Sequence, residues 1–336
     1  MRLLVLGGTQ WLGSTVARKA VARGHEVTAL ARGVSGHVPP GVTLVRADRG
    51  EPGAYDAVAD AEWDAVIDVA RQPGHVRGAL SALGERTEHW VFVSSCSVYA
   101  AHDTPGADES AALLPAHPGD TAPPESYGEG KVACEGAVAA HRAGGSYLIA
   151  RAGLISGPGD HTDRTGYWPL RFAHPATVDG AVLVPDQPGL ATQVIDVRDL
   201  AAWLVTSAET RQAGTFNAAG DVVPLAEHLD CARRVAGHDG PVVPAAPDWL
   251  AEQGVQEWAG ERSLPLWLST PGWEAFMARG TGAARAAGLV PRPLEDTLRD
   301  TLVWELAAGP GRPRKAGLLP ADEQALLRAL RSPSDS

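Results

Sequence analysis

The sequence predicts an α/β fold in which a doubly wound parallel sheet is joined to a smaller, mostly helical C-terminal lobe. Short apolar runs alternate with helical patterns through the first half of the chain, which is typical of parallel strands joined by crossover helices. Strands of this kind form continuous apolar runs because helices cover both faces of the sheet. The 336 residues, 44% of them hydrophobic, can bury a large core.

The first half is predicted to hold six strands and four helices. The strands are expected at 2–6, 26–30, 42–46, 65–69, 89–94 and 146–151, and the helices at about 11–23, 52–59, 73–84 and 124–142. Pro73 is well placed in the first turn of its helix, where its missing N–H is tolerated. Residues 100–123 contain four prolines and no periodicity. They predict a long loop, either an active-site lid or a solvated insertion.

The second half has a looser pattern. Glycines and prolines after Gly153 predict irregular backbone. A strand at 193–197, a helix at 199–209 and a strand at 214–218 then form a regular unit that is expected to rejoin the first sheet. The remainder, 224–336, is predicted to be mostly helical, with a surface amphipathic helix at its end.

Composition excludes several classes of function. A net charge of −11 repels a phosphate backbone, so nucleic-acid binding is not expected. The three cysteines, Cys96, Cys134 and Cys231, are far apart, and the histidines show no ligand spacing, so we expect reduced thiols, a cytoplasmic location and no metal site. No stretch approaches the roughly 20 apolar residues of a membrane span, and the N-terminal run does not resemble a secretory signal. No membrane role is expected.

A glycine-rich turn from Gly7 to Gly13 follows the first strand and opens a helix. Gly7 permits a tight turn, Gly13 lets the helix pack closely on the strand, and the helix N-terminus offers unpaired N–H groups to phosphate oxygens. Gln10 stands where such motifs normally have their middle glycine. A purely structural turn is the alternative, but the strand, turn and helix together favour dinucleotide binding by a Rossmann-type domain.

This interpretation divides the chain into three parts. Residues 1–152 and about 190–220 are expected to form the dinucleotide-binding domain. A substrate-binding lobe is expected from about 153–189 and 221–305, and a tail with a surface helix from 306–336.

The end of the second predicted strand favours NADP over NAD. An acidic residue for the ribose hydroxyls of NAD is expected there, but the sequence has Ala31 and Arg32. An arginine can pair with a 2′-phosphate, and the missing carboxylate removes a group that would repel that phosphate. The alternative is an exposed arginine with no role in binding.

Tyr127 and Lys131 are spaced i, i+4 on a predicted helix and therefore project from one face. A phenol is a poor base at neutral pH, but an adjacent ammonium and an oxidised nicotinamide favour its phenolate form. Such a pair suits the proton transfer that accompanies hydride transfer. Upstream, Ser94 and Ser95 end an interior strand, where a hydroxyl can donate to a substrate oxygen. The alternatives are a surface pair and a turn-forming serine cluster.

Together these motifs resemble the extended (atypical) short-chain dehydrogenase/reductase family, often described as NAD-dependent epimerases/dehydratases. The resemblance covers residues 1 to about 220: the glycine turn, Asp48, the Ser-Ser-x-x-Val-Tyr segment, Tyr-x-x-x-Lys, and the segments 151–158 and 195–200. It implies that Tyr127 is the catalytic acid/base. It also implies that Lys131 activates Tyr127 and holds the nicotinamide ribose, and that Ser95 orients the substrate.

The turn and the resemblance together give a set of expected cofactor contacts. In the resemblance, Asp48 contacts the adenine and residues 153–155 flank the nicotinamide. The full set is Gly7, Thr9, Gln10, Trp11, Leu12, Gly13, Arg32, Asp48, Arg49, Val69, Ala70, Ser94, Tyr127, Lys131, Gly153, Leu154 and Ile155.

Three departures from the family pattern narrow the expected substrate. Cys96 and Ser97 follow Ser95 where sugar-nucleotide dehydratases have Asp-Glu, so dehydratase activity is not expected. Leu154 lies where many sugar-nucleotide enzymes have Asn, and Ala100 replaces a Gly. A nucleotide-sugar substrate is therefore not expected.

Substrate contacts are expected from Ser95, Cys96, Arg164, Trp168 and Arg198. Arg164 is suited to gripping a carboxylate or phosphate, and Trp168 to stacking on a ring. Arg164 and Trp168 belong to the segment 161–168, whose side chains are candidates to reach the substrate. The alternative for this segment is a polar surface loop with one anchoring aromatic.

Two features of the second half have simpler explanations than substrate binding. Asp196 and Asp199, on either side of Arg198, suit helix caps equally well, and we favour the caps. Four tryptophans between 249 and 273 are better explained by core packing than by an aromatic pocket.

The sequence thus predicts an NAD(P)-dependent oxidoreductase that transfers hydride between nicotinamide and a carbonyl or alcohol carbon of a small polar substrate. One alternative is a non-redox epimerase that oxidises its substrate transiently with tightly bound NAD(P). Another is a non-catalytic dinucleotide-binding regulator or RNA-associated protein. A homodimer is an expectation at the level of the family.

Overall fold

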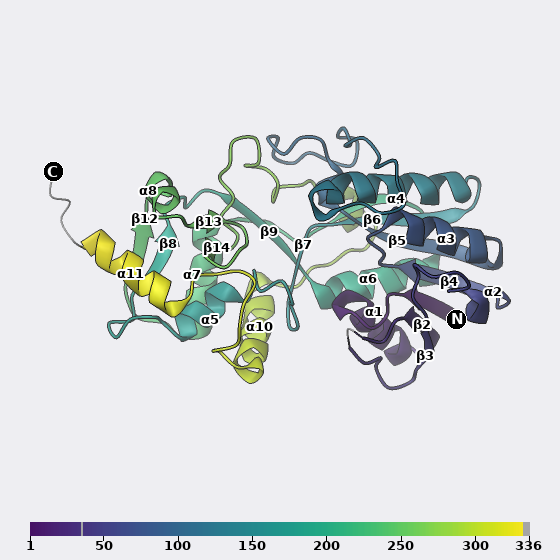
Figure 1. The fold of residues 1–336 in the computed structure, drawn as a ribbon, viewed down its shortest axis with the longest axis horizontal. Coiled ribbons are helices and arrows are strands. Elements are labelled where there is room, and N and C mark those ends of the chain that lie inside the picture. The colour runs from purple at the N-terminus through teal and green to yellow at the C-terminus, as the bar shows by residue number, and fades with distance from the viewer. Residues whose placement is uncertain (35, 332–336) are drawn as a thin grey trace.

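Two lobes follow one another along the long axis of the computed structural model, which describes residues 1–34 and 36–331 (Figure 1). The N-terminus lies in the lobe built around the larger sheet, and the last helix lies at the far end of the other lobe. Strands β7 and β9 run between them.

Seven parallel strands form the larger sheet, in the order β10-β6-β5-β4-β1-β2-β3. They are β1 (Arg2–Leu6), β2 (Glu26–Ala31), β3 (Val42–Arg46), β4 (Trp63–Asp68), β5 (Thr87–Ser95), β6 (Ser146–Ala152) and β10 (Gly214–Ala218). The chain builds outward from β1 to β3 and then restarts on the other side of β1 with β4. This reversal creates a switch point between β1 and β4, and the predicted doubly wound fold is confirmed.

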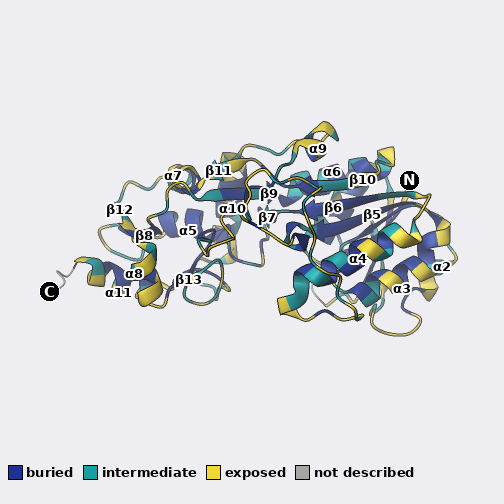
Figure 2. Ribbon diagram, turned by 90° about the horizontal axis from the view of Figure 1, so that it is seen from above, coloured by how far each residue is buried: buried dark blue, intermediate teal, exposed yellow. Residues whose placement is uncertain are grey.

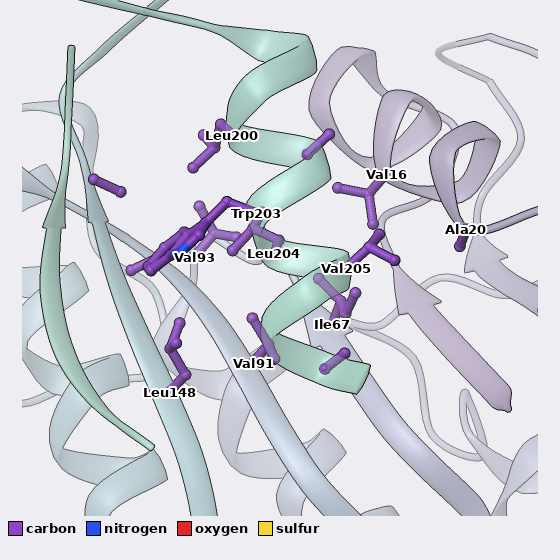
Figure 3. Close-up of a cluster of buried hydrophobic side chains, with 14 of the residues drawn as sticks. Val16, Ala20, Ile67, Val91, Val93, Leu148, Leu200, Trp203, Leu204 and Val205 are labelled. Carbon is purple, nitrogen blue, oxygen red and sulfur yellow. The ribbon is translucent and has the colours of Figure 1, made fainter. Parts of the chain in front are cut away.

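Helices cover both faces of this sheet. On one face lie α1 (Trp11–Ala22) and α6 (Val197–Thr210), and on the other α3 (Pro73–Leu83) and α4 (Tyr127–His141). Side chains alternate between the faces along each strand, so Val91 and Val93 pack under α6 while Trp90 and Phe92 pack toward α3 and α4. Figure 3 shows the first of these cores, where Trp203 and its neighbours on α6 lie over Val91, Val93 and Leu148.

The second lobe contains short strands and five helices packed around a separate core. Its strands are β7 (Leu154–Ser156), β9 (Ala191–Asp196) and β11 (Val222–Pro224) in one sheet, β8 (Val182–Pro185) with β12 (Val242–Ala245), and β13 (Gln256–Glu257) with β14 (Ser263–Leu264). Its helices are α5 (Tyr167–Ala173), α7 (Leu225–Ala236), α8 (Pro247–Glu252), α10 (Leu294–Ala308) and α11 (Pro320–Arg331). The short helix α9 (Gly282–Ala286) packs on β10 instead. Figure 2 shows buried residues facing inward in both lobes.

Several sequence-based expectations for the local structure are wrong. Strand β9 does not rejoin the larger sheet but pairs with β7 and β11, and only β10 rejoins it. The stretch after Gly153 is not irregular throughout, since it forms β7, α5 and β8. Pro169 is accommodated because it lies in the first turn of α5, where an N–H has no helical partner.

Helices were overestimated in two further places. Within 224–331 they hold less than half of the residues, because short strands and proline-rich connections fill the rest. The helix expected at 52–59 is reduced to α2 (Asp56–Ala59). The domain boundaries given above remain a prediction.

The long segment 100–123 is anchored to residues 275–280 by its first part and to the first lobe by its last part, where His117 N donates to Glu129 O and Gly74 N donates to Asp120 O, each at 2.9 Å. Gly106 N donates to Ala278 O at 2.6 Å, and Ala275 N donates to His102 O at 2.7 Å. His102 also stacks against Trp273, with ring centres 4.5 Å apart. The segment therefore braces residues 273–280, which form one wall of a cavity described below.

The described residues 1–34 and 36–331 contain neither a candidate membrane span nor a candidate metal site. None of their helices is both long enough and apolar enough to cross a membrane. No group of three or more His, Cys, Asp or Glu among these residues is arranged to hold a metal ion.

Candidate functional site

Two adjoining cavities lie at the carboxyl ends of the strands, beside the switch point of the sheet. The first, of about 420 Å³, lies at the ends of β1, β2 and β4. The second, of about 540 Å³, lies at the ends of β5 and β6 and is closed by the second lobe. They share Gln10, Val69, Arg71, Pro124 and Tyr127. Open α/β sheets bind ligands at this position.

The glycine turn between these cavities leaves no room for side chains. Gly7 has a φ of +95°, and an added Cβ would lie 2.6 Å from Val69 Cγ2. A Cβ on Gly13 would lie 2.3 Å from the Gly7 carbonyl oxygen. No side chain caps the first turn of α1, so its N–H groups remain available to an anion. This cradle fits the diphosphate of a dinucleotide.

All of the residues expected to contact the cofactor line one cavity or the other. At the adenosine end, Arg32 and Asp48 are both exposed, with Arg32 Nη1 3.8 Å from Asp48 Oδ2. Arg49 behaves differently, because its Nη1 and Nη2 bind both carboxylate oxygens of the fully buried Asp68, at 2.7 and 2.9 Å. Arg49 therefore lines the first cavity while its guanidinium is held in an ion pair, and a cofactor contact from Arg49 stays a prediction.

Tyr127 and Lys131 face the same space, as their spacing predicts. Tyr127 begins α4 and is half-buried between the two cavities. Lys131, one turn later, is 3% exposed, and its Nζ donates to Ala70 O and Val93 O at 2.7 Å each. The Nζ atom lies 5.9 Å from the centre of the Tyr127 ring. Because an ammonium has three N–H donors, one remains for a ligand.

The hydroxyls at the end of β5 have different surroundings. Ser95 Oγ accepts from Ser97 N at 3.1 Å and lines the second cavity. Ser94 Oγ donates instead to the buried Glu135, at 2.5 Å. Cys96 Sγ donates to Arg151 O at 3.3 Å, and burial raises the pKa of this thiol to about 12. Cys96 is therefore a protonated, hydrogen-bonded part of the wall.

Of the residues expected on the substrate side, the structure places Arg164 at the second cavity but neither Trp168 nor Arg198. Trp168 is fully buried in the core of the second lobe, where its Nε1 donates to Pro265 O at 2.7 Å. It lies on the inward face of α5, so the expectation that it stacks on substrate is wrong.

Arg198 is bound by acids. It pairs with Asp196 at 2.6 Å and with Asp300 of α10 at 2.5 Å, outside both cavities, so a substrate contact is not supported. Asp196 caps α6, as favoured above, by accepting from Arg198 N at 2.8 Å. Asp199 instead binds Arg292, which lies far away in the sequence.

The second lobe adds residues that the sequence did not reveal. Gln193, Trp258, Phe276 and Met277 line the second cavity, together with His161 from the segment 161–168 that was expected to reach the substrate. Burial lowers the pKa of His161, whose ring meets Trp11 edge-on with centres 5.8 Å apart. These side chains come from separate, mostly irregular segments, and no local motif brings them together. Trp258, expected in the core, is one of them.

The fold and the paired cavities define a dinucleotide-binding α/β protein. Residues 3–219 match the NAD dependent epimerase/dehydratase family, and the chain belongs to this family. The resemblance inferred from the motifs is thereby confirmed.

Individual relatives have different names. The chain is 30% identical over 266 residues to the 2'-dehydrokanamycin reductase of Streptomyces kanamyceticus, which covers 75% of this chain and 72% of that protein. It is 27% identical over 240 residues to the chloroplast stem-loop binding protein of 41 kDa b of Arabidopsis thaliana, covering 66% and 59%. The UDP-glucose 4-epimerase of Thermus thermophilus, solved in complex with NAD, has a TM-score of 0.63 at 20% identity, covering 92% of this chain and all of that one. This last likeness shows the fold.

Proposed function

We propose that this protein is an NAD(P)-dependent oxidoreductase that transfers hydride between the nicotinamide and a carbonyl or alcohol carbon of a small polar substrate. The observation that supports the proposal best is that Tyr127, Lys131 and Ser95 line one cavity, next to a glycine turn that fits a diphosphate. The reductase from S. kanamyceticus, a relative at 30% identity, adds support.

In the direction of reduction, a reduced dinucleotide held by the glycine turn and Lys131 would supply the hydride for the carbonyl carbon. The Tyr127 hydroxyl gives its proton to the carbonyl oxygen, which becomes the alcohol. The Ser95 hydroxyl, now bonded to Ser97, turns to donate to the same oxygen as negative charge develops on it. Lys131, held by two backbone carbonyls, stabilises the tyrosinate and has its third N–H free for a ribose hydroxyl. Oxidation runs these steps in reverse.

Net consumption of the cofactor tests this proposal. The protein is mixed with NADPH or NADH and a panel of carbonyl compounds, and the absorbance of the reduced nicotinamide is followed. We expect a steady loss of absorbance with at least one compound. Conversion of a substrate with no change in bulk cofactor would instead identify the epimerase. Native mass spectrometry of the purified protein gives a second readout, since a retained dinucleotide favours the epimerase.

A non-catalytic role is the remaining alternative, and the name of the A. thaliana relative is the reason to test it. The charge of −11 opposes RNA, so we expect no binding of an RNA stem-loop at physiological salt. Biological activity that survives a Tyr127→Phe substitution would favour this alternative. From the three free, buried cysteines we also propose a reducing, cytoplasmic location.

We predict that NADP binds more tightly than NAD. Arg32 is exposed at the adenosine end of the first cavity, where its guanidinium can reach a 2′-phosphate. Arg32→Gln should weaken NADP binding about tenfold and leave NAD binding unchanged, as measured by fluorescence titration. Asp48→Asn, which removes the carboxylate beside Arg32, should raise the affinity for NADP relative to that for NAD.

Arg46→Gln is the matched control, because Arg46 is exposed on the adjacent strand and lies outside the cavity. It should change neither affinity. Tighter binding of NAD than of NADP to the unmodified protein would refute the preference.

A further inference from the structure

Arg164 lines the second cavity without a carboxylate partner. Its Nε donates to Thr162 Oγ1 at 3.2 Å, and its guanidinium lies 4.7 Å from the centre of the Trp258 ring. Across residues 1–34 and 36–331, no ion pair joins it to an acid. Burial lowers the pKa of Arg164, with Asp160 and Tyr127 opposing that shift. A guanidinium withdrawn from water in this way is stabilised by an anion that it can bind directly.

The nearby acid, Asp160, is already engaged in shaping the loop. Its Oδ1 accepts from Thr162 N and Oγ1 at 2.8 and 2.6 Å, and its Oδ2 accepts from Thr165 N and Oγ1 at 3.4 and 3.0 Å. Asp160 does not line the second cavity. It therefore holds the loop that presents Arg164 and leaves the guanidinium free toward the cavity.

Strained backbone flanks Arg164 on both sides. Asp163, its neighbour in the chain, has a φ of 62°, and Trp258, on which it stacks, has a φ of 69°. Non-glycine residues rarely adopt these values, and such outliers cluster at ligand-binding sites. The Asp163 carboxylate is held by Arg312 at 2.6 Å and by Lys315 N at 2.9 Å, and Trp258 N donates to Trp267 O at 3.0 Å. The rest of the lobe thus maintains an unfavourable conformation that fixes Arg164 on Trp258.

The lining of the second cavity is basic, although the chain as a whole is acidic. Arg71, Lys131 and Arg164 line it, and among the described residues no Asp or Glu does so. Lys131 is bonded to two carbonyls, and Arg71 lies over the Tyr127 ring, 5.2 Å from its centre. Arg164 lines the same cavity and stacks on Trp258, whose ring meets that of Phe276 edge-on with centres 5.5 Å apart.

We propose that the substrate is an organic oxyanion, a carboxylate or a phosphate monoester, whose charged group binds Arg164 while its reacting carbon lies beside Tyr127. This inference rests on the proposed function, since it names the substrate of that same site. The planar guanidinium matches either oxyanion with two parallel hydrogen bonds. Stacking on Trp258 holds the Arg164 guanidinium in place before the ligand binds. The same cation repels an amine at this position.

Four ligands of similar size and different charge test the proposal: benzoate, phenyl phosphate, benzamide and benzylamine. Each is titrated by calorimetry into the protein saturated with NADP and into the protein alone. We expect the affinity for benzoate or phenyl phosphate to be at least about tenfold higher than that for benzamide. Benzylamine should not bind. The better of the two anions identifies the oxyanion.

Arg164→Gln should weaken binding of that anion by about 10- to 100-fold and leave dinucleotide affinity unchanged. Arg164→Lys keeps the positive charge but loses the two parallel N–H donors of the guanidinium, so it should retain part of the affinity. Arg234→Gln, on an exposed surface pair, is the control and should change nothing. Equal binding of all four ligands, binding of none, or full anion affinity in Arg164→Gln would overturn the inference. Failure of the dinucleotide to bind would refute the proposed function instead, and the titrations of the protein alone still report the charge preference.

Discussion

Tyr127→Phe is expected to lower the rate of hydride transfer by about 10²- to 10⁴-fold, the usual contribution of a positioned acid/base. The ring remains between the two cavities, so the shape of the site is kept and only the proton is lost. Dinucleotide affinity should therefore stay nearly unchanged. The measurements are kcat with a carbonyl compound that the protein reduces and Kd for NADP from fluorescence.

Tyr147→Phe is the matched control for this substitution. Tyr147 lies on β6, partly buried in the core under α3 and α4 and outside both cavities. Removing its hydroxyl should leave kcat unchanged. A loss of less than tenfold in Tyr127→Phe would show that another group transfers the proton. A loss of dinucleotide binding would assign Tyr127 to the cofactor instead.

The larger sheet could be predicted because its signals are local. Each strand from β1 to β6 is a short apolar run, and the sharp turn after β1 needs glycine at Gly7 and Gly13 whatever the rest of the chain does. The i, i+4 spacing of Tyr127 and Lys131 likewise fixes their shared face as soon as a helix forms there. These features depend on a few residues that are adjacent in the sequence, so they can be predicted without knowledge of the tertiary structure.

The second lobe could not be predicted in the same way, because its partners are distant in sequence. Whether β9 joins the larger sheet or pairs with β7 depends on tertiary contacts, since both choices suit the same apolar run. Trp168 and Trp258 look alike in sequence, yet one lies in the core and the other in the cavity wall. The difference lies in which face of α5 packs inward and in a left-handed backbone at Trp258.

The roles of charged residues were also set by distant partners. The guanidinium of Arg49 forms an ion pair with Asp68, at the end of β4, which the sequence did not predict. Arg198 is bound by Asp300, which is separated from it by most of the second lobe's sequence. A cationic side chain can be assigned to a ligand only after its carboxylate partners in the protein are known. Arg164 has contacts with Thr162 and Trp258 but no ion pair among the described residues.

Another such pair joins α4, the helix that carries Tyr127, to β6. Glu135, two turns after Tyr127 on α4, accepts from Arg151 Nη2 at 2.8 Å, and both side chains are 6% exposed. Glu135 also accepts from Ser94, the neighbour of Ser95. Arg151 in turn donates to the Tyr99 hydroxyl at 3.0 Å. The network links α4, β5 and β6, and so ties the Tyr127 helix to the strand that carries Ser95.

Glu135→Ala is therefore expected to lower the free energy of unfolding by about 3–5 kcal/mol, measured by urea denaturation, because it leaves Arg151 charged and buried without its partner. Glu295→Ala, in an exposed pair with Arg299, should cost about 0.5 kcal/mol or less. The double substitution Glu135→Leu with Arg151→Met should recover most of the loss, since an apolar pair needs no counter-charge. A cost below about 1 kcal/mol for Glu135→Ala would contradict the prediction. If the double variant is stable but slow in hydride transfer, the ion pair serves mainly to position Ser95 relative to Tyr127; if it is stable and fully active, the pair is purely structural.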